Sequence, residues 1–177
     1  IDIITGTSIG SIVGGLYSIG YSASEIEAIA RAQQWGSLLT DEIPRKYLSP
    51  LDKTQEQRYL VSLPLNEKNK PLLPQGIIQG HNILNLFCGL TANVPYNADF
   101  SKFPISYAGI GCDLETGKQV VLDSGFLPKA IFSSMAIPGV FHPVKYKGKL
   151  LIDGGVVNNF PVNLARKKGA DLIIGVD

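Results

Sequence analysis

The first seventeen residues constrain the fold more than any other segment of this chain. An apolar run at residues 1–4 leads into Gly-Thr-Ser-Ile-Gly at residues 6–10, and an apolar, glycine-rich stretch follows at residues 11–17. This order predicts a strand, then a tight turn with a serine at its tip, and then a helix. Such a turn pushes the serine hydroxyl clear of its own backbone, so the segment predicts that Ser8 is a nucleophile.

The residues around Ser8 suit that interpretation. Small neighbours keep a sharp turn free of clashes, and glycine accepts unusual backbone angles, which are the roles expected of Gly6 and Gly10. The helix that follows would aim its first amides at the site, and the amide of Ile9 is the natural donor to a developing oxyanion. Short matches to Gly-x-Ser-x-Gly also occur by chance in glycine-rich chains. A phosphate-binding loop fits less well, because the Lys-Ser/Thr ending of a P-loop and the third glycine of a dinucleotide fingerprint are absent.

Composition bounds the class of protein. The 177 residues are 45% hydrophobic and 18% charged, which is typical of one globular domain, here expected over residues 1–177. A net charge of +1 argues against a nucleic-acid partner. No apolar run reaches the roughly 18 residues of a membrane span. Cys88 and Cys112 form no metal or redox motif, and no cluster of carboxylates and histidines occurs, so we expect no metal and no other cofactor.

Hydrophobic patterning and turn residues predict strands that alternate with helices. Strands are expected at residues 1–4, 104–113, 118–123, 149–152 and 171–176, and helices from Ser8 to Gly20, from a capping box at residues 24–27, and at residues 80–92, 128–136 and 161–169. Residues 41–75 are irregular, with a short strand possible at residues 59–63. This alternation predicts an α/β fold, a three-layer sandwich around a mostly parallel central sheet.

Asp153 is the most conspicuous carboxylate of the chain. It follows the strand expected at residues 149–152 and precedes Gly154 and Gly155. A carboxylate at a strand end, beside a tightly turned backbone, is well placed to meet a distant side chain. Aspartate-glycine pairs are also ordinary turn signals, so a purely structural role stays open at this point.

Three blocks of the sequence resemble the patatin-like phospholipase family, in its bacterial type. The first is the segment around Ser8, residues 6–17. The second, residues 133–144, contains Ser-Ser-Met-Ala-Ile-Pro-Gly-Val-Phe and then Pro-Val. The third, residues 152–171, contains Ile-Asp-Gly-Gly-Val, Asn-Asn-Phe-Pro-Val and Gly-Ala-Asp. Their order and spacing are similar to the family over nearly all of the 177 residues.

The resemblance implies a patatin-like fold and a Ser-Asp dyad. Ser8 would be the nucleophile and Asp153, with Gly154 and Gly155 behind it, the base that accepts its proton, so that an acyl-enzyme forms and water releases the fatty acid. The family's activity implies a serine lipid acyl hydrolase, a carboxylic ester hydrolase of phospholipase A type. Its partners would be phospholipids or other acyl lipids, with transient contact with a membrane surface. The location is left open between the bacterial cytoplasm and, for a longer secreted chain, the cell envelope.

One family feature has no counterpart before Ser8. The family carries a glycine-rich loop on the strand before the nucleophile strand, and the amides of that loop form the oxyanion hole, but only seven residues precede Ser8 here. We therefore expect a domain truncated at its N-terminal strand, with an open sheet edge. Losing one oxyanion donor costs about 3 kcal/mol, so the chain alone is expected to be poorly active.

Two alternatives belong to other classes. A catalytically inactive patatin-fold module that binds lipid or protein would be consistent with the missing loop. A Ser-His-Asp hydrolase would need a histidine after its acid, whereas His81 and His142 both precede Asp153. Apolar character alone would place the lining of a substrate pocket at Leu16, Tyr17, residues 83–90 and residues 137–141.

Overall fold

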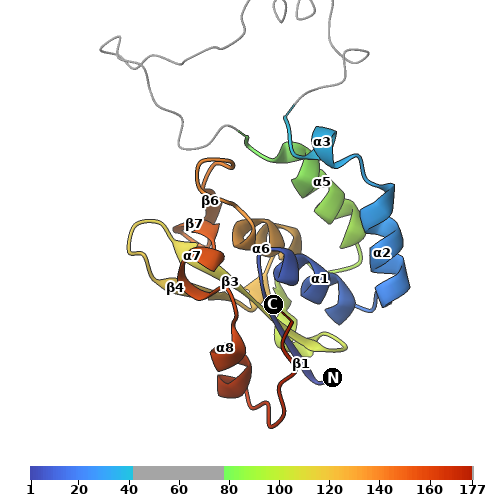
Figure 1. The fold of residues 1–177 in the computed structure, drawn as a ribbon, viewed down its shortest axis with the longest axis vertical. Helices are drawn as coiled ribbons and strands as arrows, with labels where there is room; N and C mark the ends of the chain where they lie inside the picture. Colours follow the sequence, from blue (N-terminus) through green and yellow to red (C-terminus); the bar gives the residue numbers. More distant parts are fainter. Residues whose placement is uncertain (42–77, 177) are drawn as a thin grey trace, which may run out of the picture.

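The computed structural model describes residues 1–41 and 78–176 (Figure 1). In chain order the described residues form β1 (Ile3–Thr7), α1 (Ile9–Ser18), α2 (Ala23–Ala32), α3 (Trp35–Leu38), α5 (His81–Leu90), β2 (Ala98–Asp99), the 3₁₀ helix η2 (Phe100–Lys102), β3 (Ser106–Asp113), β4 (Gln119–Leu122), β5 (Ser124–Gly125), α6 (Leu127–Ser134), β6 (Val144–Tyr146), β7 (Lys149–Asp153), α7 (Gly155–Asn158) and α8 (Val162–Lys167). The strand considered at residues 59–63 lies outside the described residues.

Strand β3 organises the main sheet. It pairs in parallel with β1 and antiparallel with β4 and β7, and β6 pairs antiparallel with β7. The expected α/β class is confirmed, and β1 pairs in parallel with β3. The other pairings of the main sheet are antiparallel among the described strands. Short turns explain two of these three pairings: they join β3 to β4 and β6 to β7, and only antiparallel neighbours can be joined in this way. Lys147 and Gly148 close the second hairpin at φ 47° and 78°, as a type I′ turn requires.

β1 and β7 lie end to end along the same edge of β3. β4 pairs with both Gly109 and Gly111 of β3, whereas β1 pairs at the first of these positions and β7 at the second. A strand has two edges, so β4 occupies one of them and β1 and β7 share the other. Thr7, the last residue of β1, lies opposite Ile110, and Asp153, the last residue of β7, lies opposite Gly111. The carboxyl ends of the two strands therefore meet at neighbouring residues of β3.

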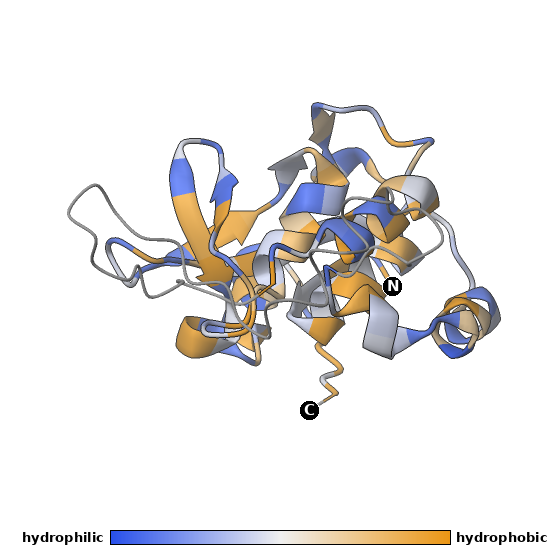
Figure 2. Ribbon diagram, turned by 90° about the horizontal axis from the view of Figure 1, so that it is seen from above, coloured by the Kyte–Doolittle hydropathy of each residue, from blue (hydrophilic) through white to orange (hydrophobic). Residues whose placement is uncertain are grey.

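Helices cover both faces of β3. Tyr107 belongs to the larger core, which contains side chains of α5 and α6, and its hydroxyl donates to the backbone oxygen of Ser11 in α1. Ala108 and Ile110 pack instead with Leu164 of α8. Successive side chains of a strand point to opposite faces, so the two groups of helices lie on opposite sides and the three-layer arrangement is confirmed. Figure 2 shows hydrophobic residues in some of the strands, and hydrophobic and hydrophilic residues alternating around the helices.

Side-chain oxygens cap the starts of α2 and α5. Helix α2 begins with a capping box between Ser22 and Glu25, not with the one expected at residues 24–27. Both segments match Ser-x-x-Glu, and the backbone of Ser22 is the one in the extended conformation that an N-cap needs. At the start of α5 the carboxylate of Asp41 accepts hydrogen bonds from the amides of residues 79–81. This contact ties the two described stretches of chain together.

The strand expected at residues 171–176 is wrong. These residues follow α8 without regular structure, and Leu172, Ile174 and Val176 are 83%, 86% and 92% exposed. Apolar, β-branched residues predict a strand, but a strand also needs a neighbour, and none of the described strands pairs with this segment. The remaining expected helices and strands are confirmed, with ends shifted by up to three residues.

Truncating Ile131 tests the core. Its side chain has no exposed surface, and a Cβ atom placed on Gly15 of α1 would lie 2.8 Å from its Cδ1 atom. We expect Ile131→Ala to lower the free energy of unfolding by about 2–5 kcal/mol in urea titrations, because it leaves a cavity between α1 and α6. The control Leu172→Ala removes an exposed side chain and should change it by about 0.5 kcal/mol or less. A similarly small loss of unfolding free energy in Ile131→Ala and Leu172→Ala would contradict the packing of α1 against α6.

Candidate active site

Ser8 occupies the predicted turn between β1 and α1. Its backbone has φ 55° and ψ −120°, which is uncommon for a residue other than glycine and costs on the order of 1–3 kcal/mol. The carbonyl oxygen of Ser8 accepts hydrogen bonds from the amides of Ser11 and Ile12, in the first turn of α1. The strand–turn–helix arrangement expected from the sequence is thus present, with the serine at its tip.

The two glycines of the turn differ in what they do. A Cβ atom on Gly6 would lie 2.2 Å from the carbonyl oxygen of Gly10, so the backbone closes on itself at this point. A Cβ atom on Gly10 would meet no atom within 4 Å. The turn therefore requires a residue without a side chain at position 6 and leaves space at position 10.

Asp153 lies against Ser8 although 145 residues separate them in the sequence. The Ser8 hydroxyl donates a hydrogen bond of 2.8 Å to Asp153 Oδ2, and the amide of Gly155 donates one of 2.6 Å to Oδ1. The side chain is buried, with 6% of the residue exposed, and both carboxylate oxygens have a partner. This fixes the carboxylate so that one oxygen faces the serine hydroxyl.

The two glycines after Asp153 lie in close contact with neighbouring atoms, the first with backbone and the second with side-chain oxygens. A Cβ atom on Gly154 would lie 2.3 Å from the carbonyl oxygen of Ile110 in β3. One on Gly155 would lie 3.1 Å from Asp153 Oδ1. Position 154 therefore needs glycine for space and not for backbone freedom, because its φ is −66°.

The backbone amides at the start of α1 differ in whether they have a hydrogen-bond acceptor. The amide of Ser8 donates to Ser134 Oγ at 3.1 Å and is therefore occupied. The amides of Ile9 and Gly10 have no acceptor among the residues that the structure describes. Free amides at a helix N-terminus attract negative charge. This geometry suits the oxyanion role expected for Ile9.

Hydroxyl groups that were not expected from the sequence lie around Ser8 and Asp153. Ser134 Oγ donates to the carbonyl oxygen of Ile110 at 2.6 Å while accepting from Ser8. Thr7 Oγ1 donates to the carbonyl oxygen of Asn158 at 2.8 Å, which ties β1 to the segment after Asp153. In the sequence, Ser134 stood out only as part of residues 133–144, which resemble the family, and the resemblance gave it no role.

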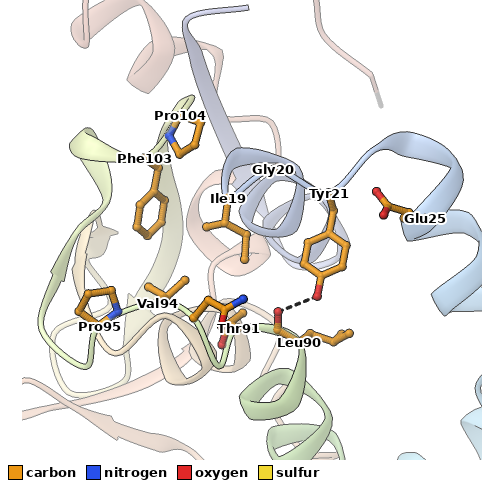
Figure 3. A pocket seen from close by; sticks show the side chains of 11 residues that line it. Ile19, Gly20, Tyr21, Glu25, Leu90, Thr91, Val94, Pro95, Phe103 and Pro104 are labelled. Carbon is orange, nitrogen blue, oxygen red and sulfur yellow. Dashed lines mark hydrogen bonds between the residues drawn. The ribbon is translucent and has the colours of Figure 1, made fainter.

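Two cavities among the described residues lie away from Ser8 and Asp153. The one in Figure 3, of about 390 Å³, lies beyond the C-terminal end of α1, where the Tyr21 hydroxyl donates to the carbonyl oxygen of Leu90. The other, of about 340 Å³, is lined by both histidines and by Lys129. Neither includes Ser8 or Asp153. Of the pocket lining expected from the sequence, Leu16, Ile83 and Phe87 are instead buried in the core, with at most 2% exposed.

Apolar side chains are exposed on the segments that carry Ser8 and Asp153 and in the loop after α6. One follows Ser8, two lie in the loop after α6, and three follow Gly155. In that order they are Ile9, Ile137, Val140, Val156, Val157 and Phe160. Between 38% and 74% of each residue is accessible. Where exposed apolar side chains form one contiguous surface, that surface is typical of contact with apolar ligands, membranes or other proteins.

Within residues 1–41 and 78–176, no three side chains of His, Cys, Asp or Glu lie close enough together to hold a metal ion. Over the same described part of the chain, no helix has the length and apolar character needed to cross a membrane. Cys88 and Cys112 are free thiols, and burial raises the pKa of both.

Comparison with known proteins matches most of the chain. The family model described as Patatin-like phospholipase matches residues 1–166. An uncharacterized NTE family protein of Mycobacterium bovis is 29% identical over 173 residues, which are 98% of this chain and 39% of that protein. Lysophospholipase NTE1 of Meyerozyma guilliermondii is 29% identical over all of this chain and 10% of its own length. Patatin-like phospholipase domain-containing protein 6 of Mus musculus is 27% identical, with 11% of its length covered. The chain thus spans less than half the length of these relatives.

The two turn glycines give a matched test of the turn geometry. We expect Gly6→Ala to destabilise the fold by several kcal/mol, because the added methyl group overlaps backbone atoms that cannot move aside. Gly10→Ala should leave the midpoint of thermal unfolding unchanged or higher, since alanine favours a helix by about 1 kcal/mol over glycine. Calorimetry of both variants measures the difference. Equal melting temperatures would contradict the tight turn at position 6.

Proposed function

The chain belongs to the patatin-like phospholipase family, and from this premise we propose that it is a serine lipid acyl hydrolase that uses Ser8 and Asp153 as a catalytic dyad. The observation that carries the proposal is the 2.8 Å hydrogen bond from the Ser8 hydroxyl to Asp153 Oδ2. A nucleophile in direct contact with a base, and a base oriented by a third group, is the arrangement that covalent catalysis needs. The third group here is the Gly155 amide.

The proposed reaction has two steps of the same form. Ser8 Oγ attacks the ester carbonyl carbon and its proton passes to Asp153, and the tetrahedral intermediate then expels the alcohol, which takes that proton. Water next attacks the acyl-serine and gives its proton to Asp153, and the fatty acid leaves as the proton returns to Ser8. The oxyanion of each intermediate would lie near the amide of Ile9, at the N-terminus of α1.

Acyl lipids are the substrate class that we propose, with phospholipids or lysophospholipids foremost. The exposed apolar side chains beside the dyad support this choice, because they offer a surface to an acyl chain and to the lipid aggregate that contains it. Two of the relatives have names that include a phospholipase activity. The same surface supports transient contact with a membrane.

Replacing the dyad tests the proposed chemistry. We expect Ser8→Ala to abolish hydrolysis of a short-chain nitrophenyl ester and labelling by a fluorophosphonate probe. Asp153→Asn should lower the rate by about 10²–10⁴, the usual contribution of a general base. The label should be found on Ser8 by peptide mass spectrometry.

Asp113→Asn is the matched control for the acid. Asp113 is a buried carboxylate on the adjacent strand, where a hydrogen bond from Lys149 lowers its pKa, and it does not contact Ser8. This variant should lose stability but keep its rate per folded molecule. A wild-type protein that neither labels nor hydrolyses would instead favour a non-catalytic module that binds lipid or protein.

The exposed apolar side chains give a second, independent prediction. Val156 is 62% exposed near Asp153, whereas Ile1, 82% exposed, lies beyond the opposite end of β1 from Ser8. We expect Val156→Ser to weaken sedimentation with phosphatidylcholine vesicles by about tenfold, since burying one valine in lipid is worth on the order of 1.5 kcal/mol. Ile1→Ser should bind as wild type does. Equal weakening in both variants, or none in either, would exclude this surface.

A further inference from the structure

The Ser134 hydroxyl forms hydrogen bonds at the point where the ends of β1 and β7 meet. Thr7 pairs with Ile110 of β3, and Asp153 pairs with Gly111 of β3. Ser8 follows Thr7 and lies in the turn outside the sheet. At this junction Ser134 Oγ donates to the carbonyl oxygen of Ile110 at 2.6 Å and accepts from the amide of Ser8 at 3.1 Å. Ser134 has no exposed surface. Its hydroxyl therefore does within the protein interior what a backbone partner would do in an uninterrupted sheet.

The backbone around Ser134 holds the other half of the dyad. The carbonyl oxygen of Ser134 accepts from the amide of Gly154 at 3.2 Å, and that of Ala136 accepts from the amide of Asp153 at 2.9 Å. The end of α6 thus binds the backbone of the nucleophile through a side chain and the backbone of the acid through two carbonyl groups.

Building on the proposed function, we propose that Ser134 is a positioning residue, which sets the Ser8 backbone relative to Asp153 so that the hydroxyl and carboxylate meet. The bonds made by the Ser8 carbonyl group run to α1, so they would move together with the turn. The bond from the Ser8 amide is different, because it links the turn to β3 and to the end of α6. It opposes rotation of the strained peptide at φ 55°.

The same bond affects the oxyanion site. It occupies the Ser8 amide, whereas the next amide, that of Ile9, has no acceptor among the described residues and is available for the substrate. Rotation of the Ser8 peptide would therefore displace both the nucleophile and the proposed oxyanion donor. Misplacing reacting groups by about 1 Å costs on the order of 10²-fold in rate, so loss of this bond acts on turnover much more than on substrate binding.

Ser133 supplies a matched control. It is the preceding residue of α6, it has no exposed surface, and its hydroxyl donates to the carbonyl oxygen of Lys129 at 2.7 Å. That bond lies within the helix and touches neither Ser8 nor the Asp153 segment. Ser133→Ala and Ser134→Ala each remove one buried hydroxyl, and only the second removes a link to the dyad.

The experiment compares these variants by kcat and KM on a soluble short-chain ester and by the rate of fluorophosphonate labelling, each per folded molecule. We expect Ser134→Ala to lower kcat and the labelling rate by about 10- to 100-fold, with KM changed by about twofold at most. Ser133→Ala should stay within about twofold of wild type. Ser134→Thr, which keeps the hydroxyl, should recover part of the lost rate. Equal rates for Ser134→Ala and Ser133→Ala would overturn the proposal.

A second measurement needs no turnover. Loss of its acceptor should speed hydrogen exchange of the Ser8 amide, followed by NMR, by about tenfold or more in Ser134→Ala and not in Ser133→Ala. Inactive wild-type protein would refute the dyad, and this exchange would still test the positioning role. Unchanged exchange in Ser134→Ala would refute that role by itself.

Discussion

The structure of the site depends on how two strands end on one edge of β3. β1 reaches this edge running parallel to β3 and β7 reaches it antiparallel, so their carboxyl ends approach each other and stop at Ile110 and Gly111. Residues 145 positions apart in the sequence are thereby brought within 2.8 Å. The close backbone contacts at Gly6 and Gly154, the end of α6 and the first amides of α1 all lie around the point where these two strand ends meet.

A regular ladder of backbone hydrogen bonds cannot continue where two strands end, and buried polar groups there need other partners. Side-chain hydroxyls supply them. Ser134 serves Ile110 and Ser8, and Thr5 and Thr7 donate to carbonyl oxygens of Pro161 and Asn158, in the segment after Asp153. These small hydroxyl groups join β1 and α6 to their surroundings without adding bulk. The cost of the positive φ at Ser8 is offset by this network and by the packing of α1.

The sequence predicted the local features well and the long-range ones poorly. The turn at Ser8 was predictable because its apolar flanks and small residues lie within seventeen positions. The strand end and the two glycines after it made Asp153 a candidate, but only the resemblance to a family paired it with Ser8, since nothing local names a distant partner. The strand expected at residues 171–176 failed because β-forming residues do not reveal whether a neighbour is present. Ser134 was missed for the same reason: its importance comes from Ser8 and Ile110, which its own surroundings in the chain do not show.

The hairpin of β6 and β7 limits how this domain can vary in length. Side chains of a strand alternate between faces, so inserting one residue between Lys149 and Asp153 would turn the carboxylate to the opposite side of the sheet, and inserting two would move it by about 6.6 Å. Extra residues at Lys147 and Gly148 would extend only the loop. Insertions in this hairpin should therefore accumulate at its turn, while the number of residues from Lys149 to Asp153 stays fixed.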